Sequence, residues 1–294
     1  MNELVDSLSA VVVNYRSADL AEACVSSLRA DGVEEIVVVD SASGDGVAER
    51  LAAVDPPCAV VAMPANRGYG AAANAGAAAT SGSAILICNA DLVVEPGTRA
   101  ALLGALTRDN GLGAVGPRID RPDGTRYPSA RAFPSLVDAA GHGFVGLVTT
   151  ENPWSRRYLR TDAEEAGPVD WVSGACLAVR RRAWDTVGGF DEAFFMFLED
   201  VDLCRRLHAA GWGVAYEPAG RVVHVEGASR ATAPYRMIAA HHVSLLRYGW
   251  RTGDPGERLF LPVVAAGLGV RTVLLWSREA WSGRTRARSP SRAR

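Results

Sequence analysis

The chain has 294 residues, 48% of them hydrophobic, which is enough for one large α/β domain with an appendage. The formal net charge of −2 excludes a generally cationic, nucleic-acid-binding molecule, so no nucleic-acid partner is expected. The five cysteines are scattered without C-x-x-C spacing, which argues against a zinc ribbon or a disulfide framework and favours a reducing cytoplasm.

The first part of the chain alternates strand and helix patterns. An apolar, β-branched run over 8–15 is typical of a buried parallel strand, and a helical pattern from about Asp19 to Ala30 follows it. The alternation continues with strands predicted at 35–39, 59–63, 84–88 and 114–119 and helices predicted at about 45–53, 69–79 and 96–108. Short connections between alternating elements predict the α/β class, with a single Rossmann-like, mostly parallel sheet flanked by helices.

The regular alternation stops after about residue 120. Prolines interrupt the segment 121–168, and we interpret it as an irregular region with a flexible loop near 151–166, because long irregular stretches in a domain are usually functional or mobile. A strand at 175–179 and a helix at about 200–210 follow, with Gly211 placed to cap the helix. A short strand is predicted at 221–225.

The C-terminal part has a different composition. Helices are predicted at 235–248 and 257–281, so we expect a domain over 1–230, with halves at about 8–120 and 121–230, and a helical extension over 231–294. An apolar helix with Trp276 before an arginine-rich end is typical of a membrane-surface element, and the alternative is a subunit contact in a homodimer. No stretch of 18 apolar residues exists, so no spanning helix is predicted.

Polar side chains stand where the predicted strands end. Parallel sheets bind ligands outside the carboxyl ends of their strands, so these residues are expected in one crevice: Asn14, Asp40, Asn66, Asn89 and Asp91. Asp40 could accept the imide N–H of a uracil or thymine ring, or it could be a turn residue before 41–44. The third helix opens after Asn66 and Gly68, and its N-terminus favours a phosphate.

The residues 68–73 also match the G-x-G-x-x-A pattern of dinucleotide-binding proteins. In that fold the glycine turn follows the first strand and an acid comes about 20 residues later. Here Asp40 precedes the glycines and the first strand leads into Asn14 and Tyr15, so an NAD enzyme is not expected.

Asp91 is the sharpest metal-site candidate, because it follows a strand of the buried type. Mg²⁺ and Mn²⁺ prefer oxygen ligands and are held by one or two carboxylates together with substrate phosphates. Asn89 could orient a bound water, and His224 could be a further ligand of the metal. Arg230 could contact a diphosphate. The alternative for Asp91 is a cap of the following helix.

Three acids, Glu199, Asp200 and Asp202, follow the apolar run 194–198. A carboxylate beside apolar rings has a raised pKa, which suits a general base. The alternative is that acids in the first turn of a helix are stabilised by the helix dipole.

Five segments in this order resemble the family 2 glycosyltransferases with the GT-A fold over roughly residues 8–230: VVVNY, VVVDSASGDG, NRGYGAAANAG, ICNADLVVEPG and GGFDEAFFMFLEDVDLCRRLHAAGW. The resemblance implies that 8–120 binds a nucleotide-diphosphate sugar and that 121–230 is the acceptor half. It implies Asp200 as the catalytic base. It implies a metal site for Mg²⁺ or Mn²⁺ with Asp91 and His224.

The resemblance also implies the remaining contacts. The donor nucleotide would be bound by Asn14, Tyr15, Asp40, Asn66, Gly68, Asn89 and Arg230. The acceptor would be bound by Trp171, Ser173, Gly174 and Glu199.

Within the family, WVSGACLAVRR and HVEGASR are similar to bacterial rhamnosyltransferases of cell-wall synthesis. This likeness implies inverting transfer of L-rhamnose from dTDP-L-rhamnose to a polyprenyl-diphosphate-linked N-acetylglucosamine by a cytoplasmic protein peripheral to the inner face of the plasma membrane. Another sugar donor, such as UDP-galactose or GDP-mannose, is the alternative of the same class. A nucleotidyltransferase is disfavoured because no glycine-rich loop follows the first strand, and a non-catalytic sugar-nucleotide-binding scaffold would not need the acids found here.

Overall fold

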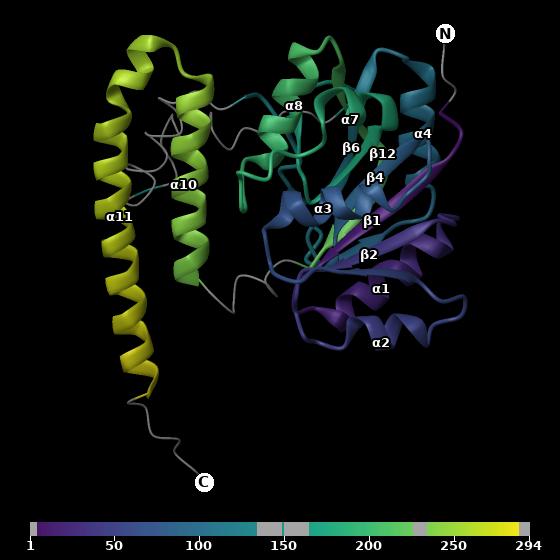
Figure 1. The fold of residues 1–294 in the computed structure, drawn as a ribbon, viewed down its shortest axis with the longest axis horizontal. Coiled ribbons are helices and arrows are strands. Elements are labelled where there is room, and N and C mark those ends of the chain that lie inside the picture. The colour runs from purple at the N-terminus through teal and green to yellow at the C-terminus, as the bar shows by residue number, and fades with distance from the viewer. Residues whose placement is uncertain (1–4, 134–148, 150–164, 226–233, 288–294) are drawn as a thin grey trace. The chain divides into compact units, whose positions relative to one another are not determined.

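The computed structural model describes residues 5–133, 149, 165–225 and 234–287, with side chains in the last range for 237–273. The described residues fall into two compact units (Figure 1). The first contains the residues up to Phe133 together with 165–225, and the second contains the two C-terminal helices.

The first unit is built around one large sheet (Figure 1). Its strands follow one another in the order β3-β2-β1-β4-β11-β6-β12-β5. Its main strands are β1 (Leu8–Asn14), β2 (Ile36–Asp40), β3 (Ala59–Ala62), β4 (Ala84–Asn89), β5 (Leu92–Val94), β6 (Leu112–Asp120), β11 (Cys176–Arg180) and β12 (Gly213–His224). Pairing is parallel from β3 through β2 and β1 to β4 and again between β6 and β12. Only β11 and β5 oppose the other strands of this path, which confirms the predicted mostly parallel sheet.

Four short strands complete the pairing among the described residues. β7 (Arg126–Tyr127) pairs with β6, and β9 (Gly167–Pro168) pairs with β12. β8 (Ala130–Arg131) and β10 (Trp171–Val172) form a separate antiparallel pair. β7, β8 and β9 lie in the region predicted to be irregular and β10 follows it, and each of these pairings is too short for a sequence pattern to indicate it.

Helices cover both faces of the sheet. Those of the first unit are α1 (Ala18–Ala30), α2 (Val47–Ala52), α3 (Tyr69–Ala78), α4 (Thr98–Arg108), α7 (Arg181–Val187) and α8 (Glu199–Ala209). Leu28 of α1 and Leu102 of α4 share a buried core with Val12 of β1. A Cβ at Gly76 of α3 would lie 2.3 Å from Val11 Cγ1, so α3 packs on the opposite face, since neighbouring strand residues point to opposite sides.

Three elements of the first unit differ from the prediction. β12 begins at Gly213, well before the predicted 221, because a register shift between Glu217 and Arg221 lets the strand continue past Pro218. The predicted helix at 96–108 begins at Thr98, because β5 comes first. α7 was not predicted, because its start, which consists of the cap Arg180 and the first helical residues 181 and 182, is a run of arginines that reads as exposed.

Buried hydrogen bonds explain why one of those arginines belongs to the core. Arg180 is only 4% exposed, and its guanidinium donates to the backbone oxygens of Leu106, Asp109 and Leu112. The charged side chain thus satisfies three carbonyls where α4 passes into β6, and a buried cation is tolerated because its donors are used.

The second unit consists of α10 (Pro234–Thr252) and α11 (Pro255–Ala287), both longer than predicted. Asp254 and Glu257 exchange hydrogen bonds with each other's backbone N–H, a capping box that starts α11. The buried His242 joins the two helices through Thr272 at 2.8 Å and Arg271 at 2.9 Å. No helix in the described part of the chain has the length and apolarity needed to cross a membrane.

Candidate active site

The carboxyl ends of neighbouring strands bring the predicted donor-side residues to one edge of the sheet. Asn14 at the end of β1 is in register with Asp40 at the end of β2, and Val13 is in register with Asn89 at the end of β4. The sheet thus places three of the predicted residues side by side, as expected for ligand binding outside the strand ends.

Asp91 and His224 meet at this edge although they lie far apart in sequence. Nε2 of His224 is 3.0 Å from Oδ1 of Asp91, and the side-chain amide of Asn89 is 3.4 Å from the same nitrogen. The pairing of β12 with β5 sets His224 opposite Leu92, and the N–H of Val225 donates to the carbonyl of Asp91. Asp91 does not cap α4, whose cap is Gly97.

The chemistry of this pair fits a divalent cation. His224 is 8% exposed, its ring packs edge-on against Tyr127, and its Nδ1 has no hydrogen-bond partner among the described residues. The described residues contain no group of three or more His, Cys, Asp or Glu side chains arranged for a metal. One carboxylate and one imidazole would therefore need phosphate oxygens and water to complete the shell, which is how Mg²⁺ is commonly held.

Asn14 and Asp40 organise the loops that follow β1 and β2. Asn14 is fully buried, donates to Asp45 Oδ2 at 3.1 Å and accepts from Ser17 Oγ at 3.0 Å. Oδ1 of Asp40 accepts hydrogen bonds from the backbone N–H and the hydroxyl of Ser43, which is the turn role considered above. Contacts of Asn14 and Asp40 with a nucleotide stay predictions.

Tyr15 follows β1 and is half-buried, with the guanidinium of Arg16 lying 5.2 Å from its ring centroid. Arg16 has a φ of 56°, a value that non-glycine residues seldom adopt. Such strained residues cluster at functional sites, which agrees with the predicted donor role of Tyr15 without testing it.

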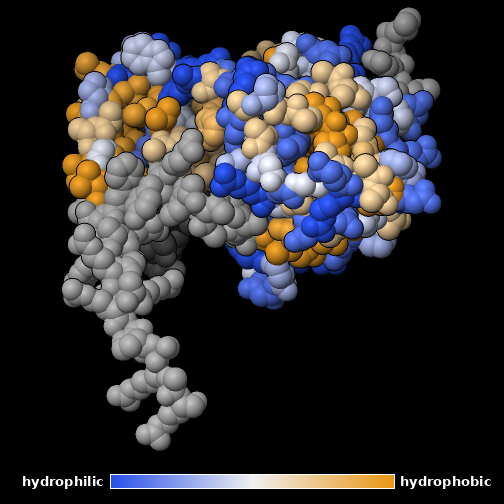
Figure 2. All heavy atoms as spheres, turned by 60° about the horizontal axis from the view of Figure 1, so that its bottom comes forward, coloured by the Kyte–Doolittle hydropathy of each residue, from blue (hydrophilic) through white to orange (hydrophobic). Residues whose placement is uncertain are grey.

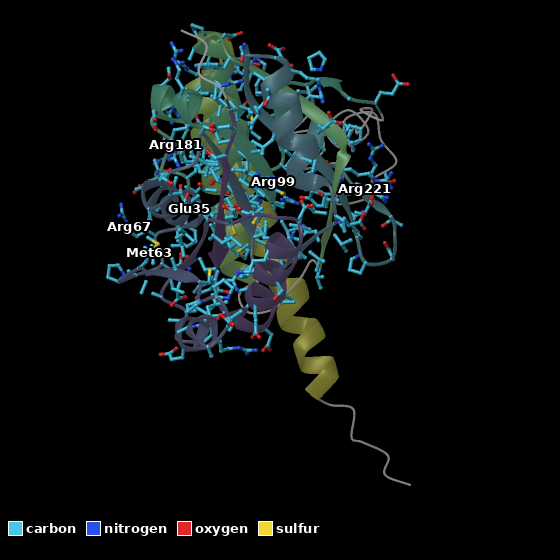
Figure 3. All side chains as sticks on the ribbon, turned by 90° about the vertical axis from the view of Figure 1, so that its right-hand side faces the viewer. Glu35, Met63, Arg67, Arg99, Arg181 and Arg221 are labelled. Atoms are coloured by element: carbon cyan, nitrogen blue, oxygen red, sulfur yellow. The ribbon has the colours of Figure 1, made fainter. Side chains whose placement is uncertain are left out.

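The turn before α3 is held against the segment that precedes α8. Asn66 Oδ1 accepts the backbone N–H of Gly68 at 3.0 Å. Gly68 has a φ of 98°, and a Cβ there would lie 2.1 Å from the carbonyl oxygen of Phe195. The exposed Arg67 pairs with Glu192, and Figure 3 shows it at the margin of the first unit opposite Arg221 of β12. Only glycine fits at position 68, which gives Gly68 a structural role in this turn. Its contact with the donor stays a prediction.

Asp200 lies in the first turn of α8 and is partly exposed. Its Oδ2 accepts the backbone N–H of Gly174 at 2.8 Å, and its Oδ1 accepts that of Val201 at 2.8 Å. Burial raises the pKa of Asp200, and the two hydrogen bonds and the charge of Arg131 oppose that rise. A carboxylate that is partly exposed and has a raised pKa has the properties of a general base.

Glu199 precedes Asp200 but lies in a different environment. Its side chain is 6% exposed, and its Oε2 has no hydrogen-bond partner among the described residues. Burial, followed by the charge of Asp200, raises the pKa of Glu199 to about 8. Glu199 and Asp200 are adjacent carboxyls whose pKa values are both raised by burial, and the backbone N–H groups of Gly174 and Val201 offset the rise for Asp200. Contact of Glu199 with an acceptor stays a prediction.

The third acid of the cluster is structural. Asp202 is buried and pairs with Arg206 at 2.7 Å, one turn along α8. The helix-dipole alternative therefore describes Asp202, whereas Asp200 presents its carboxylate to the site.

The predicted acceptor residues lie on the segment beside Asp200. Trp171 is 9% exposed, donates from Nε1 to the carbonyl of Ala132 at 2.9 Å and lies under the guanidinium of Arg131 at 5.0 Å. Ser173 is buried, and Gly174 donates to Asp200. Of the three, Gly174 contacts the candidate base directly, and the contact of all three with an acceptor stays a prediction.

Two residues near Asp200 were not predicted as site residues. One residue that was predicted lies outside the described residues. Tyr69 and Arg131 both surround Asp200 in the structure. Tyr69 lies inside the NRGYGAAANAG motif, one of the five segments that carry the family resemblance, so its position could have indicated it. Nothing in the sequence marks Arg131. Arg230 falls in the range 226–233, outside the described residues.

The first unit thus carries an Asp–His pair at the carboxyl edge of a mostly parallel sheet and a separate half-buried carboxylate on α8. The family model "Glycosyl transferase family 2" matches residues 9–188. The chain belongs to glycosyl transferase family 2, as the sequence motifs indicated.

Relatives and solved structures agree with this assignment. The chain is 37% identical over 82% of its length to the N-acetylglucosaminyl-diphospho-decaprenol L-rhamnosyltransferase of Mycobacterium tuberculosis and covers 83% of that protein. It is 33% identical to the rhamnosyltransferase WbbL of Escherichia coli over 41% of this chain and 43% of WbbL.

Two solved structures share the fold. The mannosyltransferase PcManGT of Pyrobaculum calidifontis, in complex with GDP-Man and Mn²⁺, superposes with a TM-score of 0.57 and 17% identity over 95% of this chain and 81% of that one. The structure of GalNAc-T7 with UDP, GalNAc and Mn²⁺ gives a TM-score of 0.57 and 17% identity over 76% of this chain and 44% of that one.

Proposed function

We propose that this glycosyltransferase moves L-rhamnose from dTDP-L-rhamnose, with inversion, to N-acetylglucosamine carried on a polyprenyl diphosphate. The observation that carries the proposal is the 37% identity with the mycobacterial L-rhamnosyltransferase, which extends over 82% of this chain and 83% of that protein. An alignment over 82% of this chain must reach into the predicted acceptor half at 121–230, whereas the family model ends at residue 188.

In the proposed reaction Asp200 is the base. Its partly exposed carboxylate takes the proton of the acceptor hydroxyl while the hydroxyl oxygen forms a bond to the anomeric carbon of the sugar. The bond between that carbon and the diphosphate oxygen breaks, and dTDP leaves with the electron pair. Gly174 and Val201 hold the carboxylate in place through the reaction.

Asp91 and His224 are proposed to hold a divalent cation, Mg²⁺ or Mn²⁺, beside the donor. Their facing atoms, Oδ1 and Nε2, already lie 3.0 Å apart, and the amide of Asn89 is adjacent. When bound, the cation would neutralise charge on the diphosphate leaving group. Asn14, Tyr15, Asp40, Asn66, Gly68 and Arg230 are proposed to bind the rest of the donor.

The second unit is proposed to rest on the inner face of the plasma membrane, where a polyprenyl-linked acceptor would be found. Five apolar residues of α11 recur at intervals of four and three and are all exposed: Leu259, Val263, Ala266, Val270 and Val273. Figure 2 shows hydrophobic side chains, in orange, gathered over the surface of these helices. Trp250 is 62% exposed, and Arg258 lies over its ring. An apolar stripe with an aromatic residue and nearby arginines suits an anionic lipid surface.

The test is a transfer assay with purified full-length protein and a short-chain polyprenyl-diphosphate N-acetylglucosamine acceptor. The donors dTDP-L-rhamnose, UDP-galactose and GDP-mannose are compared with Mn²⁺, with Mg²⁺ and with a chelator. Transfer of rhamnose alone, lost on chelation, is the expected result. Preference for another donor would overturn the assignment of rhamnose, and transfer that survives chelation would overturn the metal site.

The same assay distinguishes the transferase from a non-catalytic scaffold that only binds a sugar nucleotide. A scaffold binds donor without turnover, so the absence of transfer together with calorimetric binding of a donor would favour it. Turnover that disappears in Asp200→Asn, with donor binding retained, would exclude it.

A further inference from the structure

Tyr69, the first residue of α3, contacts both segments that surround Asp200. Its backbone N–H donates to the carbonyl of Phe195 at 3.0 Å. Its phenol donates to the carbonyl of Gly174 at 2.6 Å. Gly174 donates its own N–H to Oδ2 of Asp200 at 2.8 Å. A chain of two short hydrogen bonds therefore runs from Tyr69 through one glycine to the candidate base.

Gly174 is buried between two hydrogen-bonded neighbours, since the N–H of Ser173 donates to the carbonyl of Ser129 and the carbonyl of Ala175 accepts the N–H of Asn89. Gly174 has no side chain, so its backbone is freer than that of other residues. A Cβ there would lie 3.1 Å from Cβ of Asp200, which shows how closely the backbone lies against the carboxylate. The neighbouring hydroxyl of Ser173 accepts the N–H of Ala175 at 3.2 Å and does not contact Gly174 itself. The phenol of Tyr69 holds the carbonyl of Gly174 itself and so adds to the restraint that these neighbours provide.

The other contact of Tyr69 supports the backbone that leads into α8. Phe197 and Leu198 have φ values of 69° and 66°, a conformation that costs free energy in residues with side chains. Such a conformation persists only where the surroundings hold it. The hydrogen bond from Tyr69 to Phe195 lies two residues before it, on the backbone that carries Asp200.

The phenol is suited to this task. Burial raises the pKa of Tyr69 well above its ordinary value, so the hydroxyl keeps its proton and remains a donor. The ring packs edge-on against Phe190, with centroids 6.0 Å apart, which limits its movement.

We infer that Tyr69 is a positioning residue for Asp200, acting through Gly174, and that it ties the donor-side helix α3 to the base. The inference rests on the proposed role of Asp200 in the transfer reaction. Because Asn66 and Gly68 precede Tyr69 directly, the turn proposed to bind the donor and the base are parts of one hydrogen-bonded assembly.

The consequence of losing the phenol follows from the surroundings of Asp200. The hydrogen bond from Gly174 lowers the pKa of Asp200 against the effect of burial, so a looser Gly174 leaves that pKa higher. The titratable or charged groups that act on Asp200 are Glu199 and Cys204 on α8, Arg131 on β8 and Tyr69 on α3. Of these, only the tyrosine is altered by Tyr69→Phe.

The kinetic test compares wild type, Tyr69→Phe and a matched control in the full-length protein. We expect Tyr69→Phe to lower kcat roughly ten- to a hundredfold, because small displacements of a reacting group have effects of that size. Donor KM should stay near the wild-type value, and the acid limb of kcat/KM should move to higher pH, since the base must be ionised. The control is Tyr216→Phe, which removes another buried phenol, bonded to Arg126 on β7.

A second measurement does not depend on the donor or on turnover. Titration of ¹³C-labelled carboxyl groups in the free protein, with Asp200→Asn to assign the signal, should show a higher pKa for Asp200 in Tyr69→Phe. An unchanged Asp200 titration overturns the inference even if the wild type transfers no rhamnose. Conversely, a shifted titration in a protein that transfers another sugar retains the inference and overturns the assignment of rhamnose. A wild-type kcat and pH profile in Tyr69→Phe, or the same shifts in Tyr216→Phe, would also overturn it.

Discussion

The imidazole of His224 contacts the carboxylate of Asp91 at 3.0 Å across 133 positions of sequence. The contact exists because β12 pairs with the short strand β5, which begins directly after Asp91. Two side chains that could share a cation are thus placed by strand pairing, which is a more rigid support than a loop.

Replacement of either member of this pair should weaken metal-dependent donor binding. We expect Asp91→Ala to lose the greater part of it, because a carboxylate is the preferred ligand of Mg²⁺, and His224→Ala to lose less. Isothermal calorimetry of donor binding with and without Mn²⁺ measures both effects. The same donor affinity in Asp91→Ala and wild type, with Mn²⁺ present, would contradict the metal site.

Loss of the proposed base should affect turnover and spare binding. Asp200→Asn keeps the shape of the side chain and removes its ability to take a proton, so kcat should fall about 10²–10⁴-fold. Donor affinity should stay close to the wild-type value. Asp202→Asn is the matched control, because that acid is engaged by Arg206 and lies in the same helix. A near-normal kcat in Asp200→Asn would remove Asp200 from the mechanism.

The buried Glu199 should make the stability of the protein depend on pH. Its pKa is raised from 4.5 to about 8 in the folded state, so the folded state binds the proton more tightly than the unfolded chain. Stability is therefore lost progressively as the pH rises from about 4.5 toward 8. Glu199→Gln keeps a neutral side chain, so its Tm relative to wild type should rise across this window. Differential scanning calorimetry at pH 5 and pH 8 checks it, and an equal difference in Tm at both pH values would contradict the raised pKa.

Gly68 should tolerate no side chain. Its φ of 98° and ψ of 172° lie in a region open to glycine alone, and a Cβ would meet the carbonyl oxygen of Phe195 at 2.1 Å. Gly32→Ala is the control, because Gly32 also has a positive φ but nothing within 4 Å of a Cβ. Gly32→Ala should cost about 1–3 kcal/mol of unfolding free energy from its backbone alone, and Gly68→Ala should cost more. Urea unfolding compares them, and equal losses would mean that the contact with Phe195 is readily relieved.

The apolar stripe of α11 should decide lipid binding. Leu259→Ser and Val263→Ser, at side chains 76% and 70% exposed, should reduce sedimentation with phosphatidylglycerol vesicles without lowering Tm. Val93→Ser, at a valine 40% exposed on β5, is the control and should leave sedimentation unchanged. Unaltered sedimentation of the α11 variants would contradict a lipid-binding role of the stripe. A wild-type dimer that these variants dissociate, as measured by light scattering, would instead assign the stripe to a contact between two copies of the chain.

The alternation of apolar runs and helical patterns predicted most of the sheet and its flanking helices. β11 is the instructive exception, because its residues read as an ordinary buried strand while its direction is opposite to both neighbours. Nothing in CLAVR encodes that direction, which depends on how the chain returns to the sheet after residue 165.

The candidate site was predicted in part. The sequence already grouped Asp91 with His224 at a metal site and named Asp200 as the base, but only the structure gives the 3.0 Å contact between Asp91 and His224 and the hydrogen bond from Gly174 to Asp200. Glu199 and Asp200 are neighbouring acids in the sequence, and only the structure shows that Glu199 is the more deeply buried and that Asp200 accepts hydrogen bonds from Gly174 and Val201.

The sequence by itself determined the class of this protein, since short-range periodicity sets strands and helices and the motifs stand at the ends of those strands. The tertiary structure decided which of these groups act together. Tyr69, Gly174 and Asp200 are joined by hydrogen bonds between segments more than 25 residues apart. Hydrogen bonds, burial and pKa depend on distances in space, and those distances exist only once the strands have paired and the loops at their ends have packed together.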